Sequence, residues 1–192
     1  NQSTGKTGVL LASQLVSAGA AVTFVYGPGS EEPPKGAKII RVKTVNEMFG
    51  VVKKEMKDRK FDIVILSAAA ADYTTQKSKS KIKSTNEVLM IKLQKAPKII
   101  DHIKKIQPDV FLVGFKAETD ISRKSLIEYA RKKLRESNAD IIVANDIGAK
   151  YQKDPQYNEV FIIDSSRKVI SSGRKKKTEI SKFIRKQIES RL

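Results

Sequence analysis

Along this chain, short apolar runs rich in β-branched residues alternate with amphipathic segments, and no other feature restricts its fold as strongly. The runs are apolar at successive positions, as is typical of central parallel strands that helices cover on both faces. The pattern therefore predicts an α/β fold with a mainly parallel sheet. We expect strands over residues 21–26, 38–42, 62–67, 110–115 and 140–144, and helices over 8–18, 45–57, 97–106 and 122–136.

Two regions depart from this alternation. Residues 73–95 have no helical face and many Thr, Ser and Lys residues, with a strand-like piece over 88–93, which indicates an extended flap or an interface arm. After residue 158 the pattern predicts two short strands, over 159–163 and 168–170, and a last helix capped by Thr178.

The length of 192 residues fits one domain. A helix that begins at a Gly-containing turn, as at Gly5, normally follows a buried strand. We therefore expect a first strand upstream of residue 1.

The composition excludes several kinds of chemistry. The chain has no cysteine, so thiolate catalysis, disulfides and cysteine-bound zinc are excluded, and its one histidine, His102, cannot make a His-rich metal centre. No apolar stretch approaches the roughly 20 residues that span a bilayer, and the amino end lacks the pattern of a secretory signal. We expect a cytoplasmic protein without a membrane partner.

The net charge of +17 favours an anionic partner. Charge alone does not select among nucleic acids, acidic membranes and phosphorylated small molecules. Because the bases are dispersed, with a dense block only at 174–177, and are not interleaved with aromatic residues, the sequence does not favour nucleic acid.

Three segments could bind an anionic ligand. Residues 3–8 form a Gly-containing helix entry, where free N–H groups suit an anion, although the remainder of a P-loop is missing. Residues 67–73, Ser-Ala-Ala-Ala-Ala-Asp-Tyr, follow the most hydrophobic strand, and their small side chains let a flat ligand approach the backbone. Asp72 could there hold a metal, accept from a ligand hydroxyl or cap a turn. The alternate lysines at 79, 81 and 83 could meet a triphosphate, but solvation explains them equally well.

Tyr129 and Lys133 lie one helical turn apart, which is the catalytic spacing of short-chain dehydrogenases. A dinucleotide-binding G-x-G-x-x-G is missing, and no suitably placed Ser precedes Tyr129. The sequence therefore does not favour a dehydrogenase.

Seven short segments follow one another in the order typical of a single enzyme family. They are Asn-Gln-Ser-Thr-Gly-Lys-Thr-Gly at 1–8, Ala-Ala-Ala-Ala-Asp-Tyr at 68–73, Lys-Ile-Lys at 81–83, Lys-Ala-Pro at 95–97, Val-Gly-Phe-Lys-Ala-Glu-Thr at 113–119, Ala-Asn-Asp at 144–146 and Asn-Glu-Val at 158–160. Together they resemble the motifs of phosphopantothenoylcysteine synthetase, the ligase of coenzyme A biosynthesis. Single motifs are modest, but their common register across residues 1–160 is specific.

The resemblance implies a Rossmann-like, three-layer α/β/α ligase domain with a flap at about 73–95 and a C-terminal β-hairpin plus helix. In this family the carboxylate of 4'-phosphopantothenate attacks the α-phosphorus of CTP or ATP, and pyrophosphate leaves. The amine of L-cysteine then displaces the nucleotide from the acyl intermediate. Mg²⁺ is carried mainly by the triphosphate, and no metal-ligating residue is assigned. The resemblance also implies a homodimer, to which the flap contributes, and it is compatible with a fused phosphopantothenoylcysteine decarboxylase domain upstream.

The motif matches further imply roles for individual residues. Asn1 and Lys81 are the implied catalytic residues: Asn1 corresponds to an asparagine that contacts phosphopantothenate and the acyl intermediate, and Lys81 to a flap lysine that stabilises charge on the phosphates. Gly5, Gly8 and Ala70 are expected with Asn1 at the substrate. The implied nucleotide-binding residues are Leu66, Ser67, Ala68, Asp72, Lys81, Pro97, Lys98, Ile99, Ile100, Phe115 and Lys133.

Three positions depart from the family pattern. Ala96 stands where many members have Asn, Lys116 where many have Ala, and Ser137 where some have a second helix lysine. These positions surround the nucleotide, so the choice between CTP and ATP stays open. A second interpretation of the basic composition is an α/β module that binds nucleotide or nucleic acid without chemistry; it would show salt-dependent binding and no pyrophosphate release.

Overall fold

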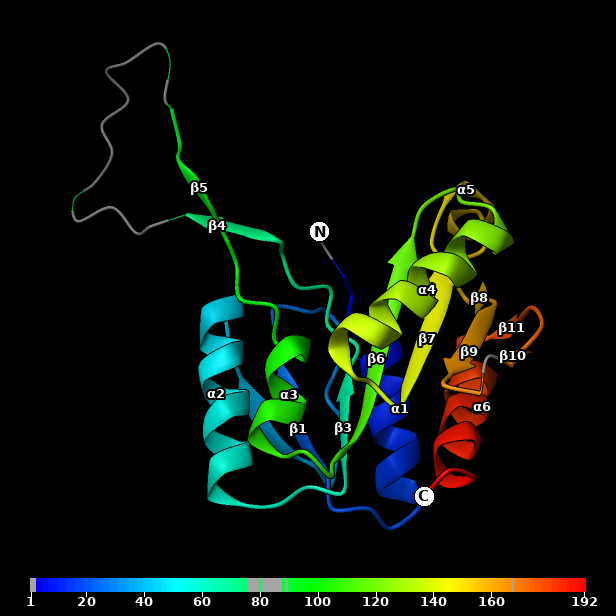
Figure 1. The fold of residues 1–192 in the computed structure, drawn as a ribbon, viewed down its shortest axis with the longest axis horizontal. Coiled ribbons are helices and arrows are strands. Elements are labelled where there is room, and N and C mark those ends of the chain that lie inside the picture. The colour runs from blue at the N-terminus through cyan, green and yellow to red at the C-terminus, as the bar shows by residue number, and fades with distance from the viewer. Residues whose placement is uncertain (1–2, 76–79, 81–87, 89, 167) are drawn as a thin grey trace.

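In the described part of the chain, the main sheet has five strands in the order β10 (Val169–Ser171), β9 (Val160–Asp164), β7 (Ile141–Asp146), β6 (Phe111–Glu118) and β3 (Ile63–Leu66). The computed structural model describes residues 3–75, 80, 88, 90–166 and 168–192. The neighbours β3, β6 and β7 are parallel, and β9 and β10 extend the sheet beyond β7 as antiparallel strands (Figure 1). The expected α/β architecture with a mainly parallel sheet is therefore confirmed.

Helices cover both faces of this sheet and enclose one apolar cluster on each side. On one face α1 (Lys6–Ser17) and α6 (Lys177–Glu189) pack against Val113 and Val143 through side chains such as Leu11 and Ile184. The opposite face is covered by α2 (Val45–Asp58), α3 (Ile100–Ile106) and α4 (Arg123–Ser137). Because β6 and β7 contribute residues to both clusters, their runs are apolar at successive positions.

Polar side chains fix where the long helices begin. The Ser122 hydroxyl accepts from the N–H of Ser125 at 3.1 Å and so caps the start of α4. The prediction that Thr178 caps the last helix is wrong. Strand β11 (Lys175–Lys176) pairs with β8 (Tyr157–Asn158) up to the residue before α6, so the helix begins directly after that strand. The Glu179 carboxylate accepts there from the N–H of Lys176 at 3.2 Å.

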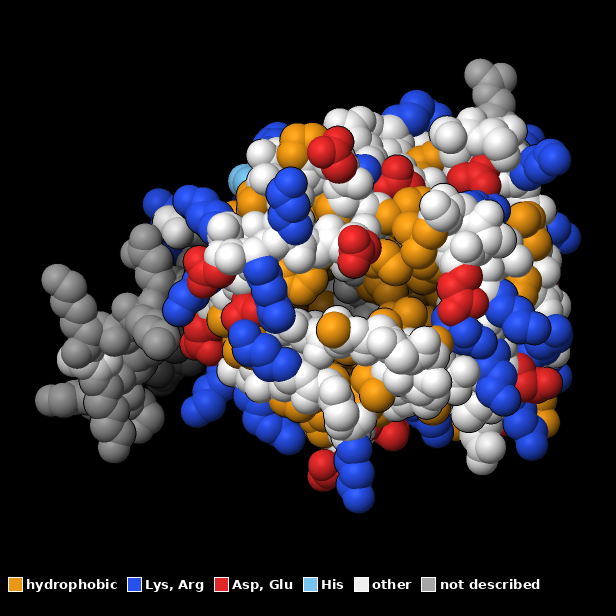
Figure 2. All heavy atoms as spheres, turned by 90° about the horizontal axis from the view of Figure 1, so that it is seen from below, with side chains coloured by type: hydrophobic (Ala, Val, Ile, Leu, Met, Phe, Trp, Pro, Cys, Tyr) orange, Lys and Arg blue, Asp and Glu red, His pale blue; other side chains and the backbone are white. Residues whose placement is uncertain are grey.

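A second, two-stranded parallel sheet is formed by β1 (Thr23–Tyr26) and β2 (Lys38–Arg41). In the described ranges, no strand pairs with the other edge of β1, nor with the edge of β3 that lies away from β6. All four residues of β3 are consequently only partly buried, although their composition is that of a central strand. The face drawn in Figure 2 is hollowed, and hydrophobic side chains line the hollow.

An arm projects from the body of the molecule (Figure 1). Its described base is the antiparallel pair β4 (Tyr73–Thr75) and β5 (Leu93–Lys95). The expected flap at 73–95 corresponds to this arm, although residues 76–79, 81–87 and 89 lie outside the described residues. A short helix, α5 (Ala149–Gln152), was not predicted. No helix in the described part of the chain has the length and apolar character needed to cross a bilayer.

Candidate functional site

The turn before α1 is held against the segment that follows β1. Gly5 has a left-handed backbone with φ of 82°, and a Cβ at this position would lie 2.9 Å from the Tyr26 ring. The Thr4 carbonyl accepts from the N–H groups of Ser30 at 3.1 Å and Glu31 at 3.2 Å. Gly5 is therefore required both by its backbone conformation and by the approach of Tyr26.

The first turn of α1 also approaches the carboxyl end of β3. A Cβ on Gly8 would lie 3.0 Å from the Ser67 hydroxyl oxygen and 3.7 Å from the Phe24 ring. The four alanines that follow Ser67 are exposed, so their backbone is open to a ligand. Two segments that the sequence identified separately, 3–8 and 67–73, thus lie together.

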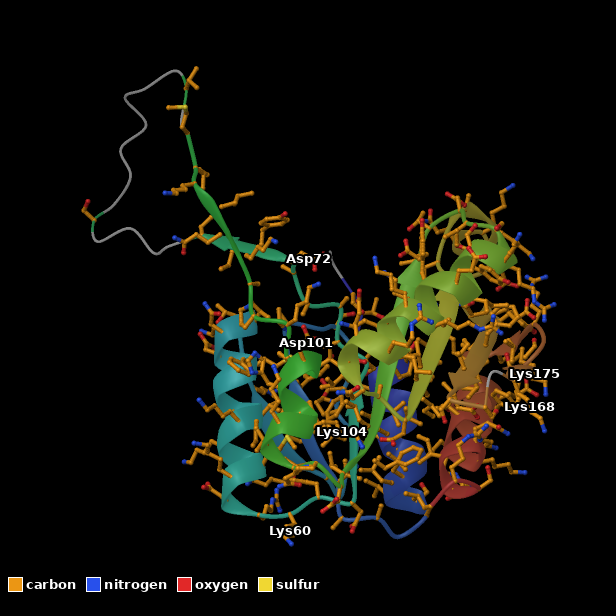
Figure 3. All side chains as sticks on the ribbon, viewed as in Figure 1. Lys60, Asp72, Asp101, Lys104, Lys168 and Lys175 are labelled. Atoms are coloured by element: carbon orange, nitrogen blue, oxygen red, sulfur yellow. The ribbon has the colours of Figure 1, made fainter. Side chains whose placement is uncertain are left out.

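Asp72 connects this edge to the start of α3. Its carbonyl accepts from the N–H of Ala96 at 2.9 Å, directly beside the β4–β5 pair. Pro97 and Lys98 continue from there into α3, whose first turn carries Asp101. In Figure 3, Asp72 lies at the base of the arm and Asp101 near the upper end of α3.

Gly114 positions α3 against the sheet. A Cβ at Gly114 would lie 2.7 Å from Cδ1 of Ile100 and 2.6 Å from Cδ1 of Ile142, so only glycine lets both side chains pack over β6. Ile99 and Ile100 are buried in the core beneath α3. Of the predicted nucleotide-binding residues, these two could therefore offer a ligand only their backbone groups.

Lys133 on α4 reaches the same helix end. Its Nζ lies 3.4 Å from an Asp101 carboxylate oxygen, and both side chains are partly buried. Nearby on the sheet edge, Lys116 pairs with Glu118 at 2.6 Å and lies 6.0 Å from the centre of the Tyr129 ring. Tyr129 thus lies beside Lys116 of β6, and Lys133 beside the start of α3.

Two other predicted residues are held mainly by the core. Leu66 packs against the cluster under α2, α3 and α4, and Phe115 packs against the cluster under α1 and α6. Both are only partly buried, so each keeps some accessible surface at the carboxyl edge. The two predicted catalytic residues, Asn1 and Lys81, lie outside the described residues.

Sequence reasoning missed Lys177, which lies near Lys6 in the first turn of α1. Burial lowers the pKa of Lys177, the positive charge of Lys6 lowers it further, and the negative charge of Glu31 opposes both effects. Lys177 is the last residue of the dense basic block at 174–177, to which the sequence assigned no function. Asp101 was also missed, although acidic residues are favoured in the first turn of a helix and this preference could have identified it.

In the described part of the chain, no three His, Asp or Glu side chains are grouped as metal ligands. The anionic groups of a ligand would instead meet helix starts and lysines.

Residues 1–192 match the family described as "DNA/pantothenate metabolism flavoprotein C-terminal domain". The chain belongs to this family. It is 38% identical over 195 residues to the coenzyme A biosynthesis bifunctional protein CoaBC of Thermococcus kodakarensis, covering 100% of this chain and 46% of that protein. It is 37% identical to the CoaBC protein of Methanocaldococcus jannaschii, covering 98% of this chain and 45% of the relative. The family member thus spans about half the length of the curated relatives it matches.

Solved structures support the same assignment. The DNA/pantothenate metabolism flavoprotein of Streptococcus pneumoniae superimposes with a TM-score of 0.85 at 26% identity, covering 100% of this chain and 90% of that one. The C-terminal domain of a CoaBC protein gives a TM-score of 0.80 at 32% identity, covering 100% and 85%. The resemblance to phosphopantothenoylcysteine synthetase inferred from the motifs is thereby confirmed at the level of family and fold.

Proposed function

We propose that this family member is a phosphopantothenate–cysteine ligase. It uses a nucleoside triphosphate, CTP or ATP, to join 4'-phosphopantothenate to L-cysteine in coenzyme A biosynthesis. The carboxylate oxygen of phosphopantothenate bonds to the α-phosphorus while the bond to pyrophosphate breaks. The cysteine amine then bonds to the acyl carbon, the nucleoside monophosphate leaves, and the amine loses a proton. The observation that carries this proposal is the meeting of four separate motif segments at one edge of the sheet, with Lys133 beside α3.

The described residues support distinct parts of this reaction. The Gly5 and Gly8 turn presents N–H groups at the start of α1, where the helix dipole favours an anion. The exposed alanines after Ser67 offer room for the flat base and sugar, and Asp72 lies at the edge of that room. Lys133 supplies positive charge near α3, so it would stabilise charge that develops on the phosphates. Asn1 and Lys81 complete the set, and Mg²⁺ enters with the triphosphate.

Pyrophosphate release tests the proposal directly. The protein is incubated with 4'-phosphopantothenate and Mg²⁺, with CTP or ATP, in the presence and absence of L-cysteine. We expect release that requires phosphopantothenate, turns over only with cysteine, and identifies the nucleotide by its rate. Lys81→Ala and Lys133→Ala should each lower the rate, whereas Lys132→Ala, on the exposed side of α4, should not. Absence of release with both nucleotides, in a protein whose fold is verified, would contradict the ligase.

We also propose that a further strand lies between β1 and β3 and joins the two sheets. Support comes from the unpaired edges of both strands in the described ranges, their partly buried apolar residues, and the hollow in Figure 2. Such a strand would lead into the turn before α1 and would complete the sheet beneath the site. The segment that precedes the matching region in the longer relatives is the proposed source of this strand.

The functional unit proposed here is a homodimer joined through the arm. Its described part exposes large apolar side chains, with Tyr73 at 55%, Met90 at 93% and Leu93 at 58% exposure. Apolar side chains that protrude together on an arm are typical of a partner-binding surface. A second copy of the chain is the proposed partner. The proposed location of the protein is the cytoplasm.

A further inference from the structure

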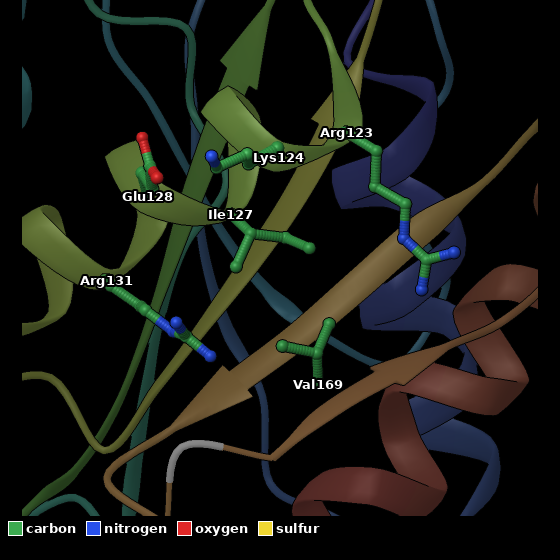
Figure 4. Close-up of a pocket in the computed structure, with 6 residues that line it drawn as sticks. All are labelled: Arg123, Lys124, Ile127, Glu128, Arg131 and Val169. Atoms are coloured by element: carbon green, nitrogen blue, oxygen red, sulfur yellow. The ribbon is translucent and has the colours of Figure 1, made fainter.

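A groove runs between α4 and β10, away from the edge that holds the proposed nucleotide site. It has a volume of about 530 Å³ and is lined by Arg123, Lys124, Ile127, Glu128, Arg131 and Val169. Ile127 and Val169 point toward each other across its centre, and the guanidinium groups of Arg123 and Arg131 lie on either side of them (Figure 4). The lining therefore combines an apolar centre with three cations and one carboxylate.

The spacing along α4 is regular. Arg123, Ile127 and Arg131 follow one another at intervals of four residues, which places them on one face of the helix about 6 Å apart in rise. In an extended peptide, side chains two residues apart also lie on one face, at about 6.6 Å. A segment with the pattern acidic-x-apolar-x-acidic therefore matches the cation-apolar-cation order of α4.

The neighbouring strand offers backbone groups to such a segment. β10 lies at the edge of the main sheet, and no strand of the described residues pairs with its outer side. Ser172 donates its N–H to the Val160 carbonyl, so by alternation the N–H and C=O of Val169 face the outer edge. The Val169 side chain packs on the α4 side, while Ile170 packs on the side of α1 and α6. Val169 thus contributes its backbone to the open edge and its side chain to the groove.

Arg123 is held in place for anion binding. Its guanidinium carbon lies 4.8 Å from the centre of the Phe161 ring, and Phe161 is itself buried. Stacking on an aromatic ring restricts a guanidinium while leaving its N–H groups able to bind a carboxylate in a bidentate manner. Glu128 and Lys124 line the groove as well, so its lining carries three cations against one carboxylate and is positive on balance.

We propose that this groove binds an acidic, extended peptide segment of a partner protein. The segment adds to the free edge of β10, its central apolar side chain fills the space between Ile127 and Val169, and its flanking carboxylates pair with Arg123 and Arg131. This mode combines main-chain hydrogen bonds, which give affinity, with side-chain contacts, which give specificity. The interaction is independent of the proposed ligase reaction, since it uses none of the residues assigned to it.

A labelled peptide with the central sequence Glu-Thr-Val-Thr-Glu, flanked by Gly and Ser, provides the test by fluorescence anisotropy. We expect saturable binding that weakens with added salt. Arg123→Glu combined with Arg131→Glu should weaken it at least about tenfold. The matched control is Lys182→Glu combined with Lys186→Glu, two exposed positions on α6 that give the same change in net charge and should preserve binding. Circular dichroism verifies that both variants are folded.

A peptide N-methylated at the residues that face β10 distinguishes strand addition from charge attraction alone. It cannot donate the main-chain hydrogen bonds, so its binding should be lost. The proposal is overturned if the unmodified peptide does not bind at millimolar concentration. It is equally overturned if the α6 variant loses as much affinity as the α4 variant, or if the N-methylated peptide binds as well as the parent.

Discussion

Lys133 and Asp101 form an ion pair of 3.4 Å that joins α4 to the first turn of α3. This distance is longer than the 2.7–2.9 Å or so of a close charge-assisted hydrogen bond. Asp101 therefore holds the ammonium group near the helix start without using its full hydrogen-bonding capacity. An incoming phosphate could compete with the carboxylate for this lysine, because both are anions and the lysine side chain is only partly buried.

Replacement of Lys133 by Ala should lower kcat/KM of the proposed ligase by about 100-fold or more, the usual effect of removing one preorganised charge from a transition state. The Lys132→Ala variant should retain its rate, because that side chain is exposed and its ion pair with Glu136 is 3.9 Å long. Steady-state pyrophosphate release measures both. Equal losses in the two variants would indicate a general effect on α4.

Asp101→Asn should act in the opposite direction on nucleotide binding. Removal of the competing carboxylate leaves Lys133 free for the triphosphate, so we expect KM for the nucleotide to fall severalfold with kcat little changed. In the double variant with Lys133→Ala this gain should vanish. A gain that persists without Lys133 would show that Asp101 acts by another route.

Gly114→Ala tests how α3 is positioned. The added methyl would lie within 2.7 Å of Ile100 and Ile142 side-chain carbons, so the free energy of unfolding should fall by about 1–3 kcal/mol, as overpacking of a core usually costs. Gly50→Ala is the control, since nothing lies within 4 Å of a Cβ there and α2 should gain about 0.5–1 kcal/mol. Urea unfolding of both variants measures these changes. A neutral Gly114 variant would show that Ile100 and Ile142 can move apart.

Much of the fold could be predicted because central strands and amphipathic helices leave strong periodic signals. A strand was predicted over residues 140–144, and in the structure β7 ends two residues later, at Asp146. The short pair β8 and β11 was missed, because two-residue strands such as Tyr157–Asn158 carry no period to detect. Thr178 was wrongly taken as a cap, because local sequence cannot show that Lys176 is already fixed by strand pairing.

The site was predictable only as separate segments. The family resemblance implied roles for Gly8, Ser67, Pro97 and Lys133. No local pattern, however, shows that Gly8 and Ser67 are neighbours. The contact arises because α1 packs beside β3, which is a property of the whole sheet. The first-turn preference could have identified Asp101, but no local pattern shows its contact with Lys133, which lies 32 residues further along the chain.

Asp164 should make stability depend on pH. Although burial raises the pKa of Asp164, hydrogen bonds from Ser166 and Arg191 outweigh it and lower the pKa below its ordinary 3.8. The folded state then favours the charged carboxylate, so this contribution is present above about pH 3.8 and is lost as the pH falls through the lower folded value.

Arg191→Ala should accordingly reduce the free energy of unfolding by about 1–3 kcal/mol at pH 7, and the difference from wild type should shrink in acid. Arg174→Ala removes a comparable but exposed Arg–Asp pair of 3.1 Å and should cost less than about 1 kcal/mol. Denaturant unfolding between pH 2.5 and 7 measures both. A pH-independent loss in the Arg191 variant would assign its effect to packing of the C-terminal residues instead.

The arm provides a test of the proposed homodimer. Met90→Glu combined with Leu93→Glu places charges on exposed apolar positions, so it should shift the protein to monomer in sedimentation velocity while leaving the melting temperature of the body unchanged. Lys92→Glu, on the same exposed segment, serves as the control and should remain dimeric. If the double variant keeps the sedimentation coefficient of the wild type, the arm does not join two copies.

The proposed strand between β1 and β3 makes the most direct prediction about stability. The segment that precedes the matching region in the Thermococcus kodakarensis relative is fused to the amino end, and a Gly/Ser extension of equal length is the control. A strand that covers the half-buried residues of β1 and β3 should add at least about 2 kcal/mol, or roughly 4–8 °C in melting temperature for a chain of this size.

Hydrogen exchange locates the effect of that extension. Amides of β1 and β3 that face the unpaired edges should exchange far more slowly with the native-like segment than with the Gly/Ser control, because a parallel neighbour would accept their hydrogen bonds. Amides of β7, which already has a partner on each side, should change little. Stabilisation without protection of β1 and β3 would place the added segment elsewhere on the molecule, and the strand between the two sheets would have to be abandoned.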